Sequence, residues 1–255
     1  MTTPDGISLS GVGKIFEGRG RTVEALRDVT LHCPPASFTA LIGPSGCGKS
    51  TALRIALGLE TADAGDVLIN GEPPVVAARS GKTGVAFQDS ALLPWRSVRR
   101  NVEMPLEVIG LNRKAHAAQV QAMIELVGLK GFENSLPGEL SGGMRQRVAI
   151  ARALVTKPSV LFMDEPFGAL DQILRRQMNV ELQRVWQETS STALLVTHGI
   201  DEAIFLADRV AVMHANPGRI VETVDVPFER PRHPDLFSNP RFHALTDRIA
   251  SVLHG

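Results

Sequence analysis

The sequence has no surplus of charge of either sign. Its 27 lysine and arginine residues are matched by 27 aspartate and glutamate residues, so the formal net charge is zero. Proteins that bind nucleic acid usually carry a basic surplus. The balance therefore argues against a nucleic-acid partner, although a local basic patch would not show in it.

Cysteine is scarce and tyrosine is absent from the chain. The two cysteines, Cys33 and Cys47, have neither the spacing of zinc ligands nor the density of a disulfide scaffold. Cys47 lies inside a glycine-rich segment, and we interpret both residues as reduced thiols of a cytosolic protein.

Long hydrophobic runs are also missing. No uninterrupted apolar stretch approaches the ~20 residues that cross a bilayer. The N-terminal segment MTTPDGISLS lacks the basic and apolar regions of a signal peptide. We expect a soluble protein that works at a membrane only through partners. Its 255 residues, 44% of them hydrophobic, suffice for a full core in one or two domains.

The first half of the chain contains short apolar runs followed by helical patterns. Strand-like runs separated by turn residues are expected at 7–16, 23–33, 37–43, 65–71 and 81–88. A helical insert follows at about 89–158. Its helical patterns are expected at 97–110, 112–129 and 141–157, with Asn112 as the N-cap of the second.

Strands and helices then alternate up to His214. Apolar strands are expected at 159–165, 192–198 and 208–214, and helices at 170–189 and 200–207. Apolar strands that alternate with helices indicate a mostly parallel sheet covered on both faces. The segment after Asn216 is rich in proline, arginine and histidine, matches no clear pattern and is assigned no function.

A phosphate-binding loop is indicated by the segment GPSGCGKST. Its residues are Gly43, Pro44, Ser45, Gly46, Cys47, Gly48, Lys49, Ser50 and Thr51. The segment fits G-x-x-x-x-G-K-[ST], follows an apolar strand and precedes a helix, whereas a chance glycine turn would not need this context. Backbone N–H groups would wrap the phosphates, Lys49 would reach the β- and γ-phosphates, and the Ser50 hydroxyl would ligate Mg²⁺.

Two acids follow the apolar run VLFM. A buried strand would deliver Asp164 beside the phosphate loop, where its carboxylate can hold Mg²⁺, while Glu165 points elsewhere and can orient or deprotonate the attacking water. Two acids that simply cap a strand are the alternative, which the preceding phosphate loop disfavours.

A second glycine-lined helix start lies in LSGGMRQR. Ser141 suffices as an N-cap, yet Gly142 and Gly143 follow in the first turn, where each costs up to ~1 kcal/mol relative to alanine. Most helix starts need no ligand. The two glycines nevertheless favour a backbone that something approaches closely, without a lysine beside it.

Together these motifs resemble the ATP-binding-cassette (ABC) transporter ATPases, and LSGGMRQR is similar to their signature motif. The resemblance covers about 7–220. It implies an α/β phosphate-loop NTPase fold: a mostly parallel sheet, an antiparallel β subdomain and an inserted α-helical subdomain. It also implies a head-to-tail dimer, in which the signature of one copy caps the γ-phosphate of ATP bound to the phosphate loop of the other.

Further positions match family landmarks in order. Phe16 matches the aromatic residue that stacks on adenine, although a core strand position is an equal interpretation. Gln88 matches the glutamine that touches Mg²⁺ and the attacking water. Asp171, in GALD, matches the loop that crosses the dimer interface, and His198 matches the switch histidine that contacts the γ-phosphate. Gly199 departs from the acid usual after that histidine, which leaves the orientation of His198 open.

The resemblance implies a nucleotide-binding domain at 5–230, with the helical subdomain at about 89–158, and a short C-terminal extension at 231–255. A small-molecule kinase lacks the signature and the switch histidine. A soluble ABC-type ATPase acting on DNA or ribosomes is the alternative to a transporter subunit. Such relatives usually have two cassettes or a coiled-coil arm, and this chain has neither.

Finer resemblance points to importers of nitrate, sulfonate and taurine, with ATP and Mg²⁺ as cofactors. The implied partners are a second copy of the chain, two membrane permease subunits and, indirectly, an extracytoplasmic solute-binding protein. The implied location is the cytoplasmic face of the inner membrane. Pro94 and Trp95 are expected in the groove that docks the permease, although Trp95 could equally be core. In this family the solute does not touch the ATPase, so the sequence does not identify it.

Overall fold

The computed structural model describes residues 6–18, 21–168 and 170–254. Its strands are β1 (Ile7–Gly18), β2 (Arg21–Cys33), β3 (Phe38–Ile42), β4 (Ala64–Ile69), β5 (Thr83–Phe87), β6 (Val160–Asp164), β7 (Thr192–Thr197), β8 (Arg209–His214) and β9 (Arg219–Asp225). Its α-helices are α1 (Lys49–Ala56), α2 (Pro74–Arg79), α3 (Val98–Val108), α4 (Ala117–Leu126), α5 (Gly142–Leu154), α6 (Gln172–Thr189), α7 (Ile200–Leu206) and α8 (Pro240–His254). Two short 3₁₀ helices are η1 (Pro137–Glu139) and η2 (Pro234–Ser238).

A six-stranded sheet in the order β5-β6-β7-β3-β8-β9 forms the centre of the fold. Only β9 runs antiparallel to its neighbour, so the expected mostly parallel sheet is confirmed. Every residue of β3 is buried because both faces of the sheet are covered. Phe38, Ala40 and Ile42 face the core shared with α3 to α8, whereas Leu41 faces the core shared with α1 and β1.

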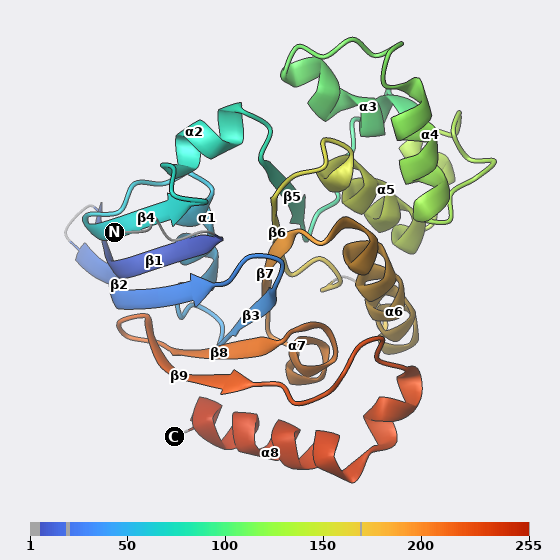
Figure 1. Cartoon of the computed structure of the whole chain (residues 1–255). Coiled ribbons are helices and arrows are strands. Elements are labelled where there is room, and N and C mark those ends of the chain that lie inside the picture. Colours follow the sequence, from blue (N-terminus) through green and yellow to red (C-terminus); the bar gives the residue numbers. More distant parts are fainter. Residues whose placement is uncertain (1–5, 19–20, 169, 255) are drawn as a thin grey trace.

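The antiparallel β subdomain is also confirmed. It is a three-stranded sheet in the order β2-β1-β4, which Figure 1 shows beside α1. Its connection to β5 contains α2, a short helix that the sequence analysis did not predict. Pro74 occupies the first turn of α2, a position that needs no backbone N–H.

The helical insert holds α3, α4, η1 and α5, grouped at one end of the molecule (Figure 1). Ser97 caps α3 by accepting a hydrogen bond from the Arg100 N–H. The predicted cap of α4 is wrong. Asn112 Oδ1 accepts the Lys114 N–H at 2.9 Å and closes a turn, while α4 begins later, after His116. An asparagine satisfies a local turn as readily as a helix start, so its presence did not fix the boundary.

The segment after Asn216, left unassigned from the sequence, folds into β9, η2 and α8. Helix α8 packs on α7 and β8 through Phe242, Leu245 and Ile249, all buried. Arg232, 3% exposed, donates to the carbonyl oxygens of three residues at the end of α7. The C-terminal extension is therefore part of the packed core rather than a loose tail.

Candidate nucleotide-binding and hydrolysis site

The functional residues predicted at strand ends lie at one edge of the sheet. Strands β5, β6, β7 and β3 run parallel, so their carboxyl ends meet there. The phosphate loop follows β3, Asp164 ends β6, Gln88 follows β5, and His198 follows β7. Strand order and chain direction thus bring together groups from four separate segments of the sequence.

Lys49 is held inside the phosphate loop. The side chain is 6% exposed, and its ammonium donates to the carbonyl oxygens of Gly43 at 2.8 Å and Pro44 at 3.1 Å. Gly48, with φ +98°, has a backbone conformation that L residues rarely adopt, and a Cβ there would meet the Ala25 carbonyl oxygen at 2.9 Å. The loop needs glycine at this position for both reasons.

A cavity of about 390 Å³ lies over this loop. The predicted residues that line it are Phe16, Ser45, Gly46, Gly48, Lys49, Ser50, Thr51 and Glu165. Phe16 is 41% exposed, with the Lys14 ammonium 5.2 Å from its ring centroid, so it is available for stacking rather than buried in the core.

Four other residues line this cavity that the sequence did not predict, namely Val23, Glu24, Ala25 and Asn216. They come from β2 and from the turn between β8 and β9. That turn is tied to β2, since the Gly218 N–H donates to the Ala25 carbonyl oxygen and the Arg27 N–H donates to the Gly218 carbonyl oxygen. No local motif marks these positions, because only the sheet packing brings them to the loop.

Asp164 and Ser50 face each other across the start of α1. The alternation of β6 puts Phe162 and Asp164 on the face that packs against α1, and Ser50 Oγ donates to Asp164 Oδ1 at 3.3 Å. Burial raises the pKa of the Asp164 carboxyl, as does the charge of Glu165. A cation beside this carboxylate would offset that penalty.

These oxygen donors suit Mg²⁺, which prefers oxygen ligands and takes few from protein when substrate phosphates supply others. Within the residues described by the structure, no three or more His, Cys, Asp or Glu side chains form a metal cluster.

Glu165 diverges from Asp164 as expected. Its backbone is left-handed, with φ 45°, and its N–H donates to the Val196 carbonyl oxygen at 2.8 Å. The turn directs the carboxylate toward His198, whose Nδ1 lies 3.3 Å from Glu165 Oε2. The Glu165 side chain lines the cavity above the phosphate loop, so it can reach a water molecule there.

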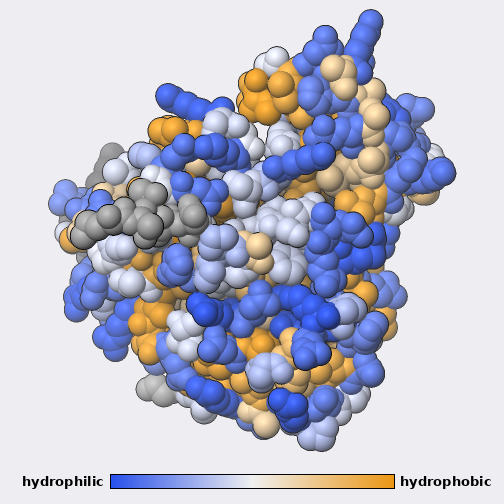
Figure 2. All heavy atoms as spheres, viewed as in Figure 1, coloured by the Kyte–Doolittle hydropathy of each residue, from blue (hydrophilic) through white to orange (hydrophobic). Residues whose placement is uncertain are grey.

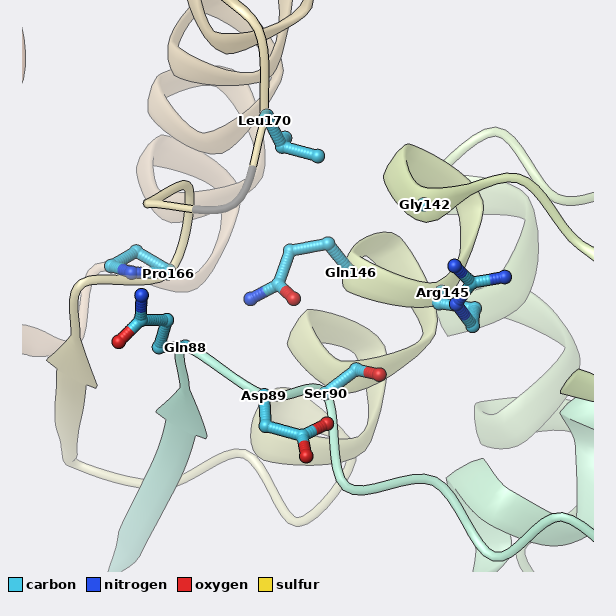
Figure 3. Close-up of a pocket in the computed structure, with 8 residues that line it drawn as sticks. All are labelled: Gln88, Asp89, Ser90, Gly142, Arg145, Gln146, Pro166 and Leu170. Carbon is cyan, nitrogen blue, oxygen red and sulfur yellow. The ribbon is translucent and has the colours of Figure 1, made fainter.

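A second hollow of about 470 Å³ lies on the signature side of the same chain. Figure 3 shows Gln88, from the end of β5, and Gln146, from α5, extending into it. Gln146 also donates to the Phe87 carbonyl oxygen at 3.2 Å. Gly142 and Arg145 complete the side formed by α5, and none of the residues lining this hollow is a lysine.

The two signature glycines differ in their surroundings. Ser141 caps α5 as predicted, accepting the Met144 N–H at 3.2 Å. Gly142 is exposed, and a Cβ there would make only ordinary contact with Leu170 at 3.7 Å. Gly143 is buried, and a Cβ there would press on Leu174 at 3.2 Å. Among the described residues, no contact requires glycine at 142, whereas packing against Leu174 accounts for Gly143.

Asp171 begins α6, and its carboxylate accepts the Leu174 N–H at 2.9 Å. Ala169, in the same GALD segment, lies outside the described residues. Arg175, missed by sequence reasoning, donates to the carbonyl oxygens of Phe167 at 3.2 Å and Leu170 at 3.0 Å. The loop after Glu165 is thereby held by the helix that follows it.

The turn after His198 is well ordered by hydrogen bonds. Gly199 has φ −89°, and its N–H donates to Thr197 Oγ1 at 3.0 Å. Glycine in place of the usual acid therefore leaves this turn hydrogen-bonded. Strand-end position alone does not single out this histidine, since His214 also ends an apolar strand, where its Nε2 lies 2.7 Å from the Val252 carbonyl oxygen.

Known proteins match this sequence and fold. The "ABC transporter" family model matches residues 26–168. The aliphatic sulfonates import ATP-binding protein of Bacillus cereus is 41% identical, over 94% of this chain and 94% of its own. The taurine import ATP-binding protein of Rhizobium johnstonii is 42% identical, over 92% and 91% of the two chains.

Solved structures agree. The dimeric structure of a bacterial ABC transporter cassette has a TM-score of 0.76 and 30% identity, covering 88% of this chain and all of the other. A second, dimeric structure of a post-hydrolysis state bound to ADP and Pi has a TM-score of 0.76 and 29% identity. The chain belongs to the ABC transporter family and is an ATP-binding ATPase of that family. Among the helices described, none has the length and apolar character of a membrane span.

Proposed function

We propose that two copies of this chain bind head to tail and enclose two ATP molecules between them. The observation that carries this proposal is the separation of two half-sites on one chain. The cavity over the phosphate loop contains Lys49 and Glu165, whereas the hollow beside Gly142 has different lining residues and no lysine. The exposed, unobstructed Gly142 suits close approach of a phosphate that another copy holds. The dimeric relative supports this arrangement.

In the proposed site, each predicted residue has a distinct task. Phe16 stacks on adenine, and the loop residues 43–51 bind the phosphates. Ser50 and Asp164 would hold Mg²⁺, which would supply charge neutralisation on the phosphates when bound. Gln88 would join them only after its side chain turns from the hollow beside Gly142, into which it extends in this structure.

Hydrolysis in this proposal depends on the chain's own acid and histidine. Glu165 orients the attacking water and accepts its proton at the carboxylate. His198, 3.3 Å from Glu165, contacts the γ-phosphate and keeps the Glu165 carboxylate in place. Ser141, Gly142, Gly143 and Asp171 complete the site from the other copy.

We further propose that the dimer powers an importer through two permease subunits at the cytoplasmic face of the membrane. A groove of about 400 Å³ lies between β5, α3 and α5, with Met104 and Val108 among its apolar lining residues. Val108 is 76% exposed and Trp95 74% exposed, so Trp95 is not core. Figure 2 shows hydrophobic surface over this end of the molecule. Such a surface suits a short cytoplasmic helix of a permease.

The relatives named above import aliphatic sulfonates and taurine. We propose an organic sulfonate, with a nitrate-type anion as the next candidate, delivered by an extracytoplasmic binding protein. None of those relatives is described as acting on DNA or ribosomes, so the soluble alternative has no support from them. Identification of the ligand on the co-purified binding protein would test the solute directly.

The dimer is tested with Glu165→Gln, which preserves shape but removes the base. We expect ATP turnover to fall by at least about 100-fold, as for loss of a general base, while ATP now stabilises a dimer visible by size-exclusion chromatography. The exposed carboxylate of Asp201 on α7 offers a matched control, Asp201→Asn. Glu165→Gln turnover near the wild-type rate, or a variant that stays monomeric with ATP, contradicts the proposal.

A further inference from the structure

A chain of hydrogen bonds joins the residues on either side of His198. The Gly199 N–H donates to Thr197 Oγ1 at 3.0 Å, and the Thr197 hydroxyl donates to Glu202 Oε2. Since the Thr197 oxygen accepts one bond, its own proton is free to be directed at the carboxylate. The residue before His198, the residue after it and the first turn of α7 are thus tied together.

Burial of the Glu202 carboxyl group at this position costs free energy. Glu202 is 6% exposed, and Thr197 is 2% exposed. The second carboxyl oxygen, Oε1, is buried without a hydrogen-bond partner among the described residues. Burial raises the pKa of the Glu202 carboxyl, an effect that the hydrogen bond from Thr197 and the electrostatic influence of Arg175 and His198 only partly offset. An apolar side chain of similar volume would avoid this cost, so stability alone does not account for Glu202.

Helix α7, which carries Glu202, is held in place by contacts with other parts of the fold. Helix α7 carries Glu202 in its first turn, and the Arg232 guanidinium binds the carbonyl oxygens of Ile204, Phe205 and Ala207 at the other end. Helix α8 packs against α7 as well (Figure 1). A hydrogen bond to Glu202 therefore ties the Thr197 turn to a fixed element.

The His198 ring itself has little else to hold it. Its side chain is 52% exposed, and its contact with Glu165 Oε2 is 3.3 Å long. Gly199 adds no side chain that could stiffen the turn, although a Cβ there would fit, at 3.4 Å from Glu202 Cβ. The backbone of the 197–199 turn sets the direction of the His198 Cα–Cβ bond, and the chain of hydrogen bonds holds that backbone.

We propose that Thr197 and Glu202 are positioning residues that aim His198 at the γ-phosphate and at Glu165. This inference rests on the proposed role of His198 in hydrolysis. Neither residue touches ATP in it. Their effect is on how often the His198 ring occupies the productive direction, so it falls on turnover and not on nucleotide affinity.

The test compares Thr197→Val, which keeps the shape and removes the hydroxyl, with Thr197→Ser, which keeps the hydroxyl. We expect Thr197→Val to lower kcat by roughly 10- to 100-fold, as a misdirected catalytic group does, with KM for ATP changed by less than about twofold. Thr197→Ser should restore kcat to within about threefold of the wild type. A purely structural role would lower Tm and active-site occupancy without this pattern of rescue.

Glu202→Gln and Glu202→Met form a second pair that does not depend on the folding of Thr197→Val. Glutamine can still accept a hydrogen bond from the Thr197 hydroxyl, so Glu202→Gln should retain most of kcat. Methionine has no such oxygen, so the kcat of Glu202→Met should fall about as far as that of Thr197→Val. Equal kcat for Thr197→Val and wild type, or equal losses for both members of either pair, overturns the inference.

His198→Ala separates this inference from the proposed function. Full turnover by His198→Ala removes the proposed role of the histidine itself. Loss of turnover in His198→Ala together with normal kcat in Thr197→Val leaves that role standing and refutes the positioning chain alone. In the His198→Ala background, Thr197→Val should cause no further loss, since its effect acts through the absent ring.

Discussion

The phosphate-loop half-site and the signature half-site differ in how far this chain by itself forms a binding site for phosphate. In the first, Lys49 is buried and already bound to the carbonyl oxygens of Gly43 and Pro44. In the second, Ser141 and Gly142 are exposed, and a Cβ at Gly142 would make only ordinary contacts, with Leu170 at 3.7 Å and Arg145 at 3.9 Å. The first is a preformed binding site for a charged ligand. In the proposed dimer, the second is a complementary surface for the phosphate that another copy holds.

The largest predicted effect breaks the second half-site alone. Gly142→Leu places a side chain on the exposed first turn of α5, where the chain itself has room for a Cβ. We expect turnover to fall by roughly 100-fold or more, because donors must lie within hydrogen-bond distance of the phosphate. ATP affinity of the monomer, measured by isothermal titration calorimetry, should not change. Unimpaired turnover in this variant would show that the signature surface does not face ATP.

A smaller effect is expected from breaking the first half-site. Lys49→Ala removes a buried ammonium that we expect to turn from the Gly43 carbonyl toward the phosphates. A charge-assisted hydrogen bond contributes up to about 3 kcal/mol to the free energy of binding, so its loss should weaken ATP binding roughly 100-fold. The same calorimetric titration checks it. Wild-type affinity would mean that backbone N–H groups alone hold the nucleotide.

Gly218→Ala tests whether the turn after β8 supports the phosphate loop. A Cβ at Gly218 would lie 2.3 Å from the Cys47 carbonyl oxygen and 2.6 Å from that of Ala25, so backbone must move. We expect a loss of about 1–3 kcal/mol in the free energy of unfolding, as for other overpacked sites, together with weaker ATP binding. Denaturant unfolding and titration measure the two. An unchanged ATP affinity in a destabilised variant would separate the turn from the loop.

The smallest effect is expected at Gly143. Alanine is favoured over glycine inside a helix by up to about 1 kcal/mol, but here its Cβ would press on the Leu174 side chain at 3.2 Å. The free energy of unfolding of Gly143→Ala should therefore stay within about 1 kcal/mol of the wild type. A much larger loss in the free energy of unfolding, measured by denaturant unfolding, would show that the Leu174 side chain cannot move aside for the added Cβ.

Local patterns carried much of the prediction. Apolar runs gave the parallel strands, and the spacing of GPSGCGKST placed the phosphate loop between β3 and α1 as observed. Where a residue type serves two local purposes, the prediction failed: Asn112 closes a turn instead of capping α4. Helix α8 was missed although Phe242, Leu245 and Ile249 are spaced for one helix face, because the prolines, arginines and histidines that precede them obscured this pattern.

The contributions of Asn216, Gly218, Thr197 and Glu202 had no sequence signal of comparable strength. Asn216 and Gly218 reach the nucleotide cavity or its loop through the contact between the β8–β9 turn and β2. Thr197 and Glu202 meet because β7 ends where α7 turns back. Each depends on contacts that no residue spacing encodes.

The amino-acid order by itself determined which chemistry this chain carries, since a phosphate loop, an acid after a buried strand and a glycine-lined helix start are each built from neighbouring residues with fixed backbone demands. Only the tertiary structure decided which of these groups share a cavity and which stand apart. Cavities are formed by side chains from distant strands, and their positions depend on sheet order and packing, which short-range pattern does not contain.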